Sequence, residues 1–72
     1  MIRYLPFAEE QSHIDIGRYT THGIEAKDEH GTVLKSVHDV STNKAFVASL
    51  CQRCTAHHLD PIHLRDVVED SI

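Results

Sequence analysis

The sequence predicts an α+β fold: a three-stranded antiparallel β-meander followed by two α-helices packed on one face of the sheet. Before about residue 40, apolar and polar residues alternate with a period of two, which is typical of half-buried strands. After that point, apolar residues recur every three or four positions, which is typical of helices that bury one side. The 72 residues suffice for a single small domain over residues 1–72.

Two strands are expected before residue 28. The first covers residues 1–8, and Pro6 confines it to a sheet edge or a strand end because proline has no backbone N–H. The polar residues 9–12 predict a break, after which residues 13–27 form one long strand with bulges at Gly17 and Gly23. One face of this strand is predicted to carry Ile14, Ile16, Thr20, His22, Ile24 and Ala26, and the other Asp15, Tyr19, Thr21, Glu25 and Lys27.

A hairpin turn is predicted at residues 28–31, where Asp-Glu-His-Gly fits a type I turn followed by a glycine with positive φ. The return strand covers residues 32–40. This turn predicts a register in which Asp28 opposes Thr32 and opposite charges face each other across the strands. The further predicted pairs are Glu25 with Lys35, Ala26 with Leu34, Ile24 with Ser36 and His22 with His38.

Two helices are predicted after the sheet. Ser41 or Thr42 is expected to cap a helix over residues 43–57, because a hydroxyl oxygen accepts a free backbone N–H at a helix start. Asp60 and Pro61 are expected to begin the last helix, over residues 61–70. The apolar stripe of the first helix is Phe46, Val47, Leu50, Cys51 and Cys54, and that of the second is Leu64, Val67 and Val68, with Ile72 as a further candidate.

Three segments of the chain resemble a family of short, uncharacterised Gram-positive bacterial proteins. They are Thr21-His22-Gly23-Ile24-Glu25, Asp39-Val40-Ser41-Thr42, and the stretch from Leu59 to Asp70 with its Asp-Pro-Ile-His-Leu-Arg-Asp-Val-Val-Glu-Asp sequence. Together they span most of the chain after residue 20. The resemblance implies a domain of unknown function, with no known activity, cofactor or catalytic residue.

Composition argues against several classes of function. Seven Lys and Arg residues are spread evenly and outnumbered by eleven Asp and Glu, which gives a net charge of −4, whereas nucleic-acid binding needs a concentrated positive patch. No apolar run approaches the roughly 18 residues of a membrane span, and no secretory leader is recognisable. Two cysteines are too few for a disulfide-based secreted scaffold. We therefore expect a cytoplasmic protein that binds neither nucleic acid nor a membrane.

The most distinctive string is Cys51-x-x-Cys54-x-x-His57-His58, in a chain with seven histidines. On a continuous helix, Cys51, Cys54 and His58 fall within about 60° of one another, so they are candidate zinc ligands, and His63 is a possible fourth. The alternative is that both cysteines are small buried apolar residues and that the histidines end the helix. The histidine count is compatible with metal binding or with a pH response, but we favour the interpretation that the histidines fill half-exposed polar positions.

Other reactive arrangements are weaker. A redox or nucleophilic cysteine needs a lowered pKa, as at a helix N-terminus, whereas both thiols lie late in the predicted helix. The predicted pair of His22 and His38 places two imidazoles on one sheet face, which is half of a metal site that a second chain would have to complete. His63 and Asp66, one helical turn apart, are a common solvated surface pair. We therefore predict no enzyme activity and no cofactor.

The function predicted from these observations is a non-enzymatic protein-interaction or regulatory module, and the alternative is a small metal-binding protein using Cys51, Cys54 and His58. The expected partner is a protein, with a homodimer as the first choice, because a chain this short has little apolar surface to cover both faces of its sheet. The contact is expected at a strand edge or on the open sheet face. On that face the sequence predicts an apolar patch of Tyr19, Val33 and Val37.

Overall fold

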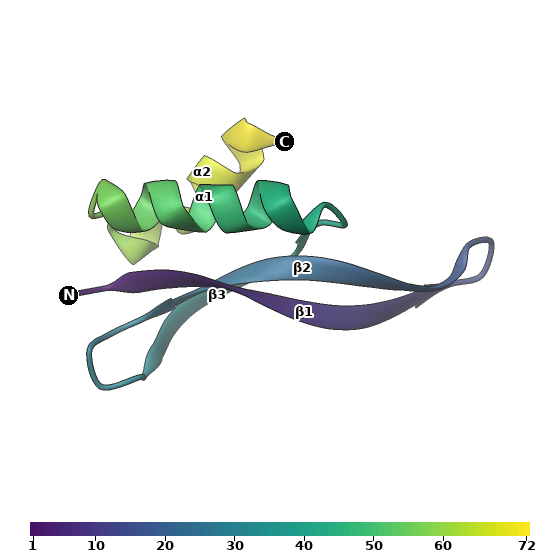
Figure 1. The fold of residues 1–72 in the computed structure, drawn as a ribbon, viewed down its shortest axis with the longest axis horizontal. Helices are drawn as coiled ribbons and strands as arrows, with labels where there is room; N and C mark the ends of the chain where they lie inside the picture. Colours follow the sequence, from purple (N-terminus) through teal and green to yellow (C-terminus); the bar gives the residue numbers. More distant parts are fainter.

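The computed structural model describes all residues from 1 to 72 and confirms the α+β fold (Figure 1). Three antiparallel strands form one sheet in the order β1-β2-β3, and both helices lie on one side of it. The strands are β1 Arg3–His13, β2 Gly17–Lys27 and β3 Val33–Ser41. The helical elements are α1 Lys44–Ala56, a 3₁₀ turn η1 Pro61–His63, and α2 Leu64–Ser71.

The β1–β2 hairpin differs from the prediction in its length and in the position of its turn. β1 pairs with β2 without interruption up to the pair His13–Gly17. The predicted break at residues 9–12 is therefore wrong, and so is the predicted strand start at His13, because residues 14–16 form the turn. The polar residues remain in the strand because this end of the hairpin extends beyond the helices, where side chains on both faces meet water and backbone hydrogen bonds hold the ladder (Figure 1).

The hydrophobic core lies between the sheet and the helices. Ile24 and Ala26 share one face of β2, as the alternation predicted, and both are fully buried. Tyr4 opposes Ala26 from β1 and is also buried. α1 covers them with the predicted stripe, of which only Phe46 is half-buried rather than buried. The buried hydrophobic residues are Tyr4, Ile24, Ala26, Val40, Val47, Leu50, Cys51, Cys54, Leu64 and Val68.

The turn between β2 and β3 has the predicted conformation. Gly31 has a φ of +82°, and its amide donates to the Asp28 carbonyl at 3.0 Å. The Asp28 amide in turn donates to the Thr32 carbonyl at 3.0 Å, so these two residues oppose each other as predicted. The Asp28 carboxylate also accepts hydrogen bonds from the amides of His30 and Thr32, which ties the turn together.

The predicted register beyond this turn is wrong by one residue. Ala26 opposes Lys35 instead of Leu34, because Leu34 is an extra residue in β3 that bulges out of the ladder. A bulge shifts every later pair, and counting from the turn does not detect it. Glu25 therefore does not pair with Lys35; its carboxylate lies 3.3 Å from the Lys27 ammonium on its own strand.

The shifted register changes which residues of β3 face the core. Ile24 opposes Val37, so Val37 packs against the core and not on the open face where it was predicted. A second irregularity lies between His22 and Ile24, and it places His22 opposite Ser41. The predicted His22–His38 pair is therefore also wrong.

Both ends of α1 are set by local hydrogen bonds. The N-cap is Asn43, not the predicted Ser41 or Thr42: its side-chain oxygen accepts from the Phe46 amide at 3.0 Å. At the other end His58 adopts a φ of +52°, and its amide donates to the Thr55 carbonyl. The Leu59 amide donates to the Cys54 carbonyl, which completes a Schellman motif in which His58 occupies the position that usually belongs to glycine.

The C-terminal segment begins as predicted. The Asp60 carboxylate accepts from the Ile62 amide at 3.1 Å, and Pro61 takes the first helical position of η1. The segment then continues as α2, which buries Leu64 and Val68 but leaves Ile72 exposed. None of the helices is long and apolar enough to cross a membrane.

The outer edge of β1 has few free hydrogen-bonding groups near Tyr4 and Pro6. The Tyr4 amide points away from β2 and donates to the Thr55 hydroxyl of α1 at 3.0 Å. Residues two apart in a strand point the same way, so Pro6 occupies the next outward position and has no N–H to offer. The Tyr4 hydroxyl donates to the Leu59 carbonyl and ties the same strand to the end of α1. Another strand therefore finds few free donors along this part of the edge.

Candidate functional site

The three predicted metal ligands do not converge. Cys51 and Cys54 are buried in the core-facing stripe of α1, whereas the His58 side chain is exposed beyond the helix end. The prediction assumed a helix continuing to His58, but the last helical residue is Ala56 and the backbone reverses at His58. No group of three His, Cys, Asp or Glu side chains in the chain is arranged to hold a metal ion.

The electrostatics of the two thiols oppose reactivity at neutral pH. Burial raises the pKa of the Cys51 thiol to about 11, and the neighbouring Cys54 adds to this shift. Burial also raises the pKa of Cys54, although the positive charge of Arg53 acts in the opposite direction. Since the thiolate is the nucleophile and the metal ligand, both residues behave as apolar core side chains near pH 7.

The remaining predicted histidine sites are also rearranged. His38 lies on the sheet face opposite the helices, where its Nδ1 is 3.1 Å from a carboxylate oxygen of Glu9. Its ring meets the ring of Phe7 edge-on, at a centroid distance of 5.1 Å. His63 and Asp66 are both exposed and share no hydrogen bond, so they form a solvated surface pair.

The open sheet face is partly covered by its own side chains. Of the predicted patch, Tyr19 is half-buried, Val33 is 48% exposed, and Val37 belongs to the core. The Glu25–Lys27 ion pair lies on the same face, with its side chains only 24% and 31% exposed. The apolar surface available on this face is therefore smaller than the sequence predicted.

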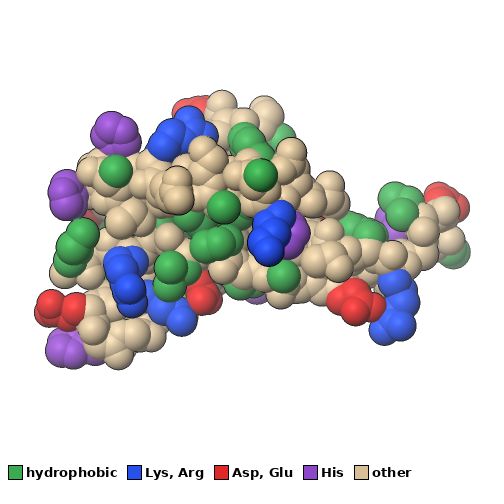
Figure 2. Space-filling model, viewed as in Figure 1, with side chains coloured by type: hydrophobic (Ala, Val, Ile, Leu, Met, Phe, Trp, Pro, Cys, Tyr) green, Lys and Arg blue, Asp and Glu red, His purple; other side chains and the backbone are tan.

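A projecting arm carries Ile14, the most exposed of the large apolar side chains. We define the arm as residues 10–20, the end of the β1–β2 hairpin that extends past the helices (Figure 1). Figure 2 shows it as a narrow extension with hydrophobic and acidic side chains at its end. Ile14 and Ile16 in its turn are 98% and 70% exposed, with the carboxylate of Asp15 between them.

The backbone of the arm holds this turn in a defined shape. The Ile16 amide donates to the His13 carbonyl at 3.2 Å, and the Asp15 amide donates to the His13 ring nitrogen Nδ1 at 3.2 Å. Gly17 follows with a φ of +86°, which returns the chain into β2. The Asp15 carboxylate takes part in none of the ion pairs of the chain. The tip thus presents two aliphatic side chains flanking an unpaired negative charge.

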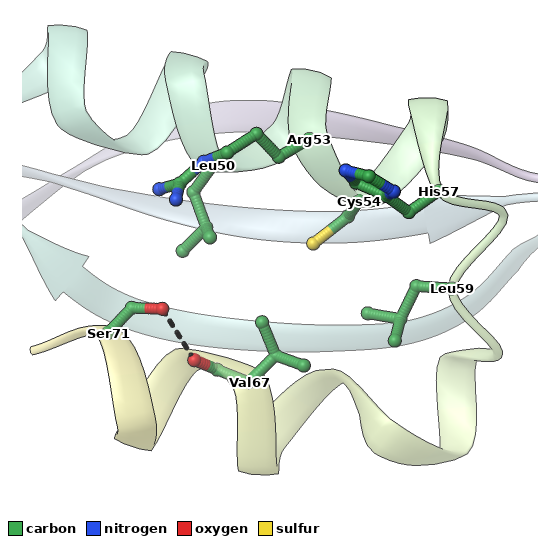
Figure 3. A pocket seen from close by; sticks show the side chains of 7 residues that line it. All are labelled: Leu50, Arg53, Cys54, His57, Leu59, Val67 and Ser71. Carbon is green, nitrogen blue, oxygen red and sulfur yellow. Dashed lines mark hydrogen bonds between the residues drawn. The ribbon is translucent and has the colours of Figure 1, made fainter.

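A second feature is a hollow of about 290 Å³ between α1 and α2, which we call the interhelical hollow. Figure 3 shows Leu50 and the Cys54 sulfur pointing from α1 toward Val67 of α2, with Leu59 closing one end. The Ser71 hydroxyl donates to the Val67 carbonyl at 2.8 Å, so its proton is already used. The lining residues are Leu50, Arg53, Cys54, His57, Leu59, Val67 and Ser71.

The hollow combines an apolar floor with a basic rim. Leu50, Cys54, Leu59 and Val67 supply the floor, and no carboxylate is among the lining residues. The Arg53 guanidinium forms no ion pair within the chain, and His57, four residues later, is the C-cap of α1. Such a site suits an apolar group that carries a negative charge.

Sequence reasoning missed both features. Ile14 and Ile16 fitted the alternation of a strand, so they were predicted on its apolar face and not at a turn. Asp15 and Gly17 were the available signal, because aspartate and glycine are common turn residues. Arg53 of α1 and Val67 of α2 belong to elements that meet only in the folded chain, and no local pattern connects them.

Comparison with known proteins identifies a family for this chain but no activity. No curated protein and no solved structure matches it. A family match covers residues 3–72, which is nearly the whole chain and includes every strand and helix described above. The chain belongs to DUF6514, a family of unknown function.

Proposed function

We propose that this protein is a non-enzymatic protein-interaction module that acts through its arm. The observation that carries the proposal is the exposure of Ile14 and Ile16 at the end of an uninterrupted hairpin ladder of eleven residue pairs. Large aliphatic side chains contribute nothing to the stability of a monomer when water surrounds them on all sides. Binding another protein would remove this surface from water.

The arm is better suited to this role than the open sheet face. On the face, Tyr19 and Phe7 are half-buried and only Val33 is exposed, whereas no part of the chain covers the turn of the arm. The β1 edge is capped at Tyr4 and interrupted at Pro6, and β3 is bulged at Leu34, which discourages strand addition there.

The chemistry of the titratable groups supports a binding role over a catalytic one. The raised pKa values of Cys51 and Cys54 keep both sulfurs as neutral thiols near pH 7, where a nucleophilic cysteine needs a lowered pKa. The exposed histidines are distributed over separate elements and none lies in hydrogen-bond contact with a thiol.

Site-specific photo-cross-linking in living cells tests this function. A photo-reactive amino acid is placed at the position of Ile14, and a matched control carries it at His30, in the turn of the other hairpin. Both positions are exposed and lie in turns, so both variants should fold alike. We expect one defined cross-linked product from position 14 that is absent from position 30, and that is reduced when Ile16→Asp is added.

The readout is the mass and identity of the cross-linked species, whichever protein it contains. Equal cross-linking from the two turns, or none from position 14 in the cells that naturally make this protein, would show that the arm is not a binding surface.

A further inference from the structure

We infer that the arm of one chain docks into the interhelical hollow of a second copy, and that two chains exchange arms in this way to form a symmetric dimer. This inference rests on the proposed interaction function and names its partner. Ile14 and Ile16 would enter the apolar floor of the partner's hollow. Asp15 would meet Arg53 of the partner subunit at the rim.

The tip of the arm and the interhelical hollow are complementary in shape, and both are apolar. The tip is a narrow convex turn with exposed aliphatic side chains, and the hollow is a concave site whose floor is formed by Leu50, Leu59 and Val67. Its volume of about 290 Å³ lies at the lower limit for small-molecule sites, so it suits one or two aliphatic side chains better than a large cofactor.

The two surfaces are also complementary in charge. The tip carries the unpaired carboxylate of Asp15, and the rim of the hollow carries the unpaired guanidinium of Arg53 with His57 beside it. Each charge lacks a partner within its own chain, and the contact would supply both. Arginine is the cation that pairs best with a carboxylate, because its planar N–H donors match the two oxygens.

A chain cannot make this contact with itself. The arm projects from the end of the sheet where α1 begins, whereas the hollow lies beside the later turns of α1 (Figure 1). The molecule is 41 Å long in this direction, and the continuous β1–β2 ladder holds the tip away from the helices. If each chain supplies one arm and one hollow to the other, a two-fold axis closes the assembly at two chains.

A second apolar groove, between β1 and α1, is the competing receptor for the tip. It has a volume of about 490 Å³ and a single cation, Arg3, which also forms no ion pair in the chain. The interhelical hollow is preferred because two basic side chains lie at its rim. The comparison of Arg53 with Arg3 therefore provides a matched control within the same chain.

Charge reversal measured by sedimentation equilibrium tests the pairing. We expect Asp15→Arg and Arg53→Asp each to raise the dimer dissociation constant about tenfold or more, because like charges then face each other. The double variant should return the constant to near the wild-type value. Asp15, Arg53 and the control position Arg3 are all exposed, so circular dichroism should show that the variants fold like the wild type.

The control double variant combines Asp15→Arg with Arg3→Asp and should remain dissociated. Rescue by Arg3→Asp instead of Arg53→Asp would overturn the assignment to the hollow. A wild-type protein that stays monomeric at high micromolar concentration, or that grows into open-ended polymers, would overturn the exchanged dimer. A monomer whose arm still yields a photo-cross-link to a different protein would leave the proposed function standing while removing this inference.

Disulfide trapping gives an independent readout of the same contact. Ile16→Cys places a thiol at the tip, and His57→Cys in the same chain places a second, exposed thiol at the rim of the hollow. Oxidation with a copper–phenanthroline catalyst should form a covalent dimer that peptide mass mapping assigns to the link between positions 16 and 57. The control combines His30→Cys with His57→Cys and should give no link between positions 30 and 57. A dimer linked only between two copies of position 16 would contradict docking into the hollow.

Discussion

Gly23 lies on the central strand, close to Phe7 of β1 and to Val37 of β3, and Gly23→Ala tests how tightly the sheet is packed there. A Cβ built on Gly23 would lie 2.5 Å from the tip of the Phe7 ring and 2.6 Å from the carbonyl oxygen of Val37. Favourable contacts between carbon atoms occur at about 3.5–4.0 Å, so both neighbours would have to move by about 1 Å. The ring of Phe7 can rotate away, but the Val37 carbonyl belongs to the backbone of the Ile24–Val37 pair.

The magnitude follows from two opposing effects. Forcing an extra methyl group into packed surroundings costs about 1–3 kcal/mol, and a backbone neighbour favours the upper half of that range. Replacing glycine by alanine where φ is not positive restricts the unfolded chain and recovers about 0.4–1 kcal/mol. We therefore expect a net loss of about 1–2.6 kcal/mol in the free energy of unfolding. For a domain of this size, that corresponds to a fall in Tm of roughly 4–21 °C.

Urea titration and thermal unfolding followed by circular dichroism measure this loss, at one low protein concentration so that self-association does not contribute. Phe7→Ala in the same chain removes the ring contact but leaves the Val37 carbonyl. Gly23→Ala should therefore cost less in the Phe7→Ala background than in the wild type, but should still be destabilising. Gly17→Ala is the control: nothing lies within 4 Å of its Cβ, and only its φ of +86° opposes the change, at about 1 kcal/mol. A Gly23→Ala variant as stable as the wild type would refute the close approach of the Phe7 ring and the Val37 carbonyl to Gly23.

Three further outcomes follow from local features. His58→Gly should raise the free energy of unfolding by about 1 kcal/mol in urea titration, because glycine adopts a φ of +52° without steric cost; no gain would argue against a strained helix end. Thr21→Val should lower it by about 1.5 kcal/mol, because the buried hydroxyl donates to the Asp39 carboxylate at 2.6 Å. Stability should also fall as pH rises from about 9 toward about 11, because the folded state holds the proton of Cys51 at pH values where the unfolded thiol has lost it. In Cys51→Ala this alkaline slope should be smaller, and an unchanged slope would assign it to other groups.

The sequence alone determined those elements whose cause is local. The turn at residues 28–31 was correct in conformation, because Asp28 and Gly31 satisfy its hydrogen bonds and its positive φ without outside help. The alternation of Ile24 and Ala26 identified the core face of β2, and Asp60 with Pro61 located the start of the C-terminal helical segment. The dimer expectation also came from the sequence, and stays a proposal.

Tertiary structure decided what depends on contacts between distant segments. The bulge at Leu34 moved Val37 from the open face into the core: it places Val37, and not the polar Ser36, opposite Ile24 beneath the helices, where burying an apolar side chain stabilises the fold. The end of α1 at Ala56 separated His58 from the two cysteines, since the chain must reverse there to bring Leu59 and α2 over Cys54. The arm likewise exists only because the β1–β2 hairpin extends past the helices at one end of the sheet. The interhelical hollow exists because the side chains of α1 and α2 leave a space unfilled beside Val67. Local residue patterns determine hydrogen bonds over a few positions, whereas these features depend on how whole elements fill space against one another.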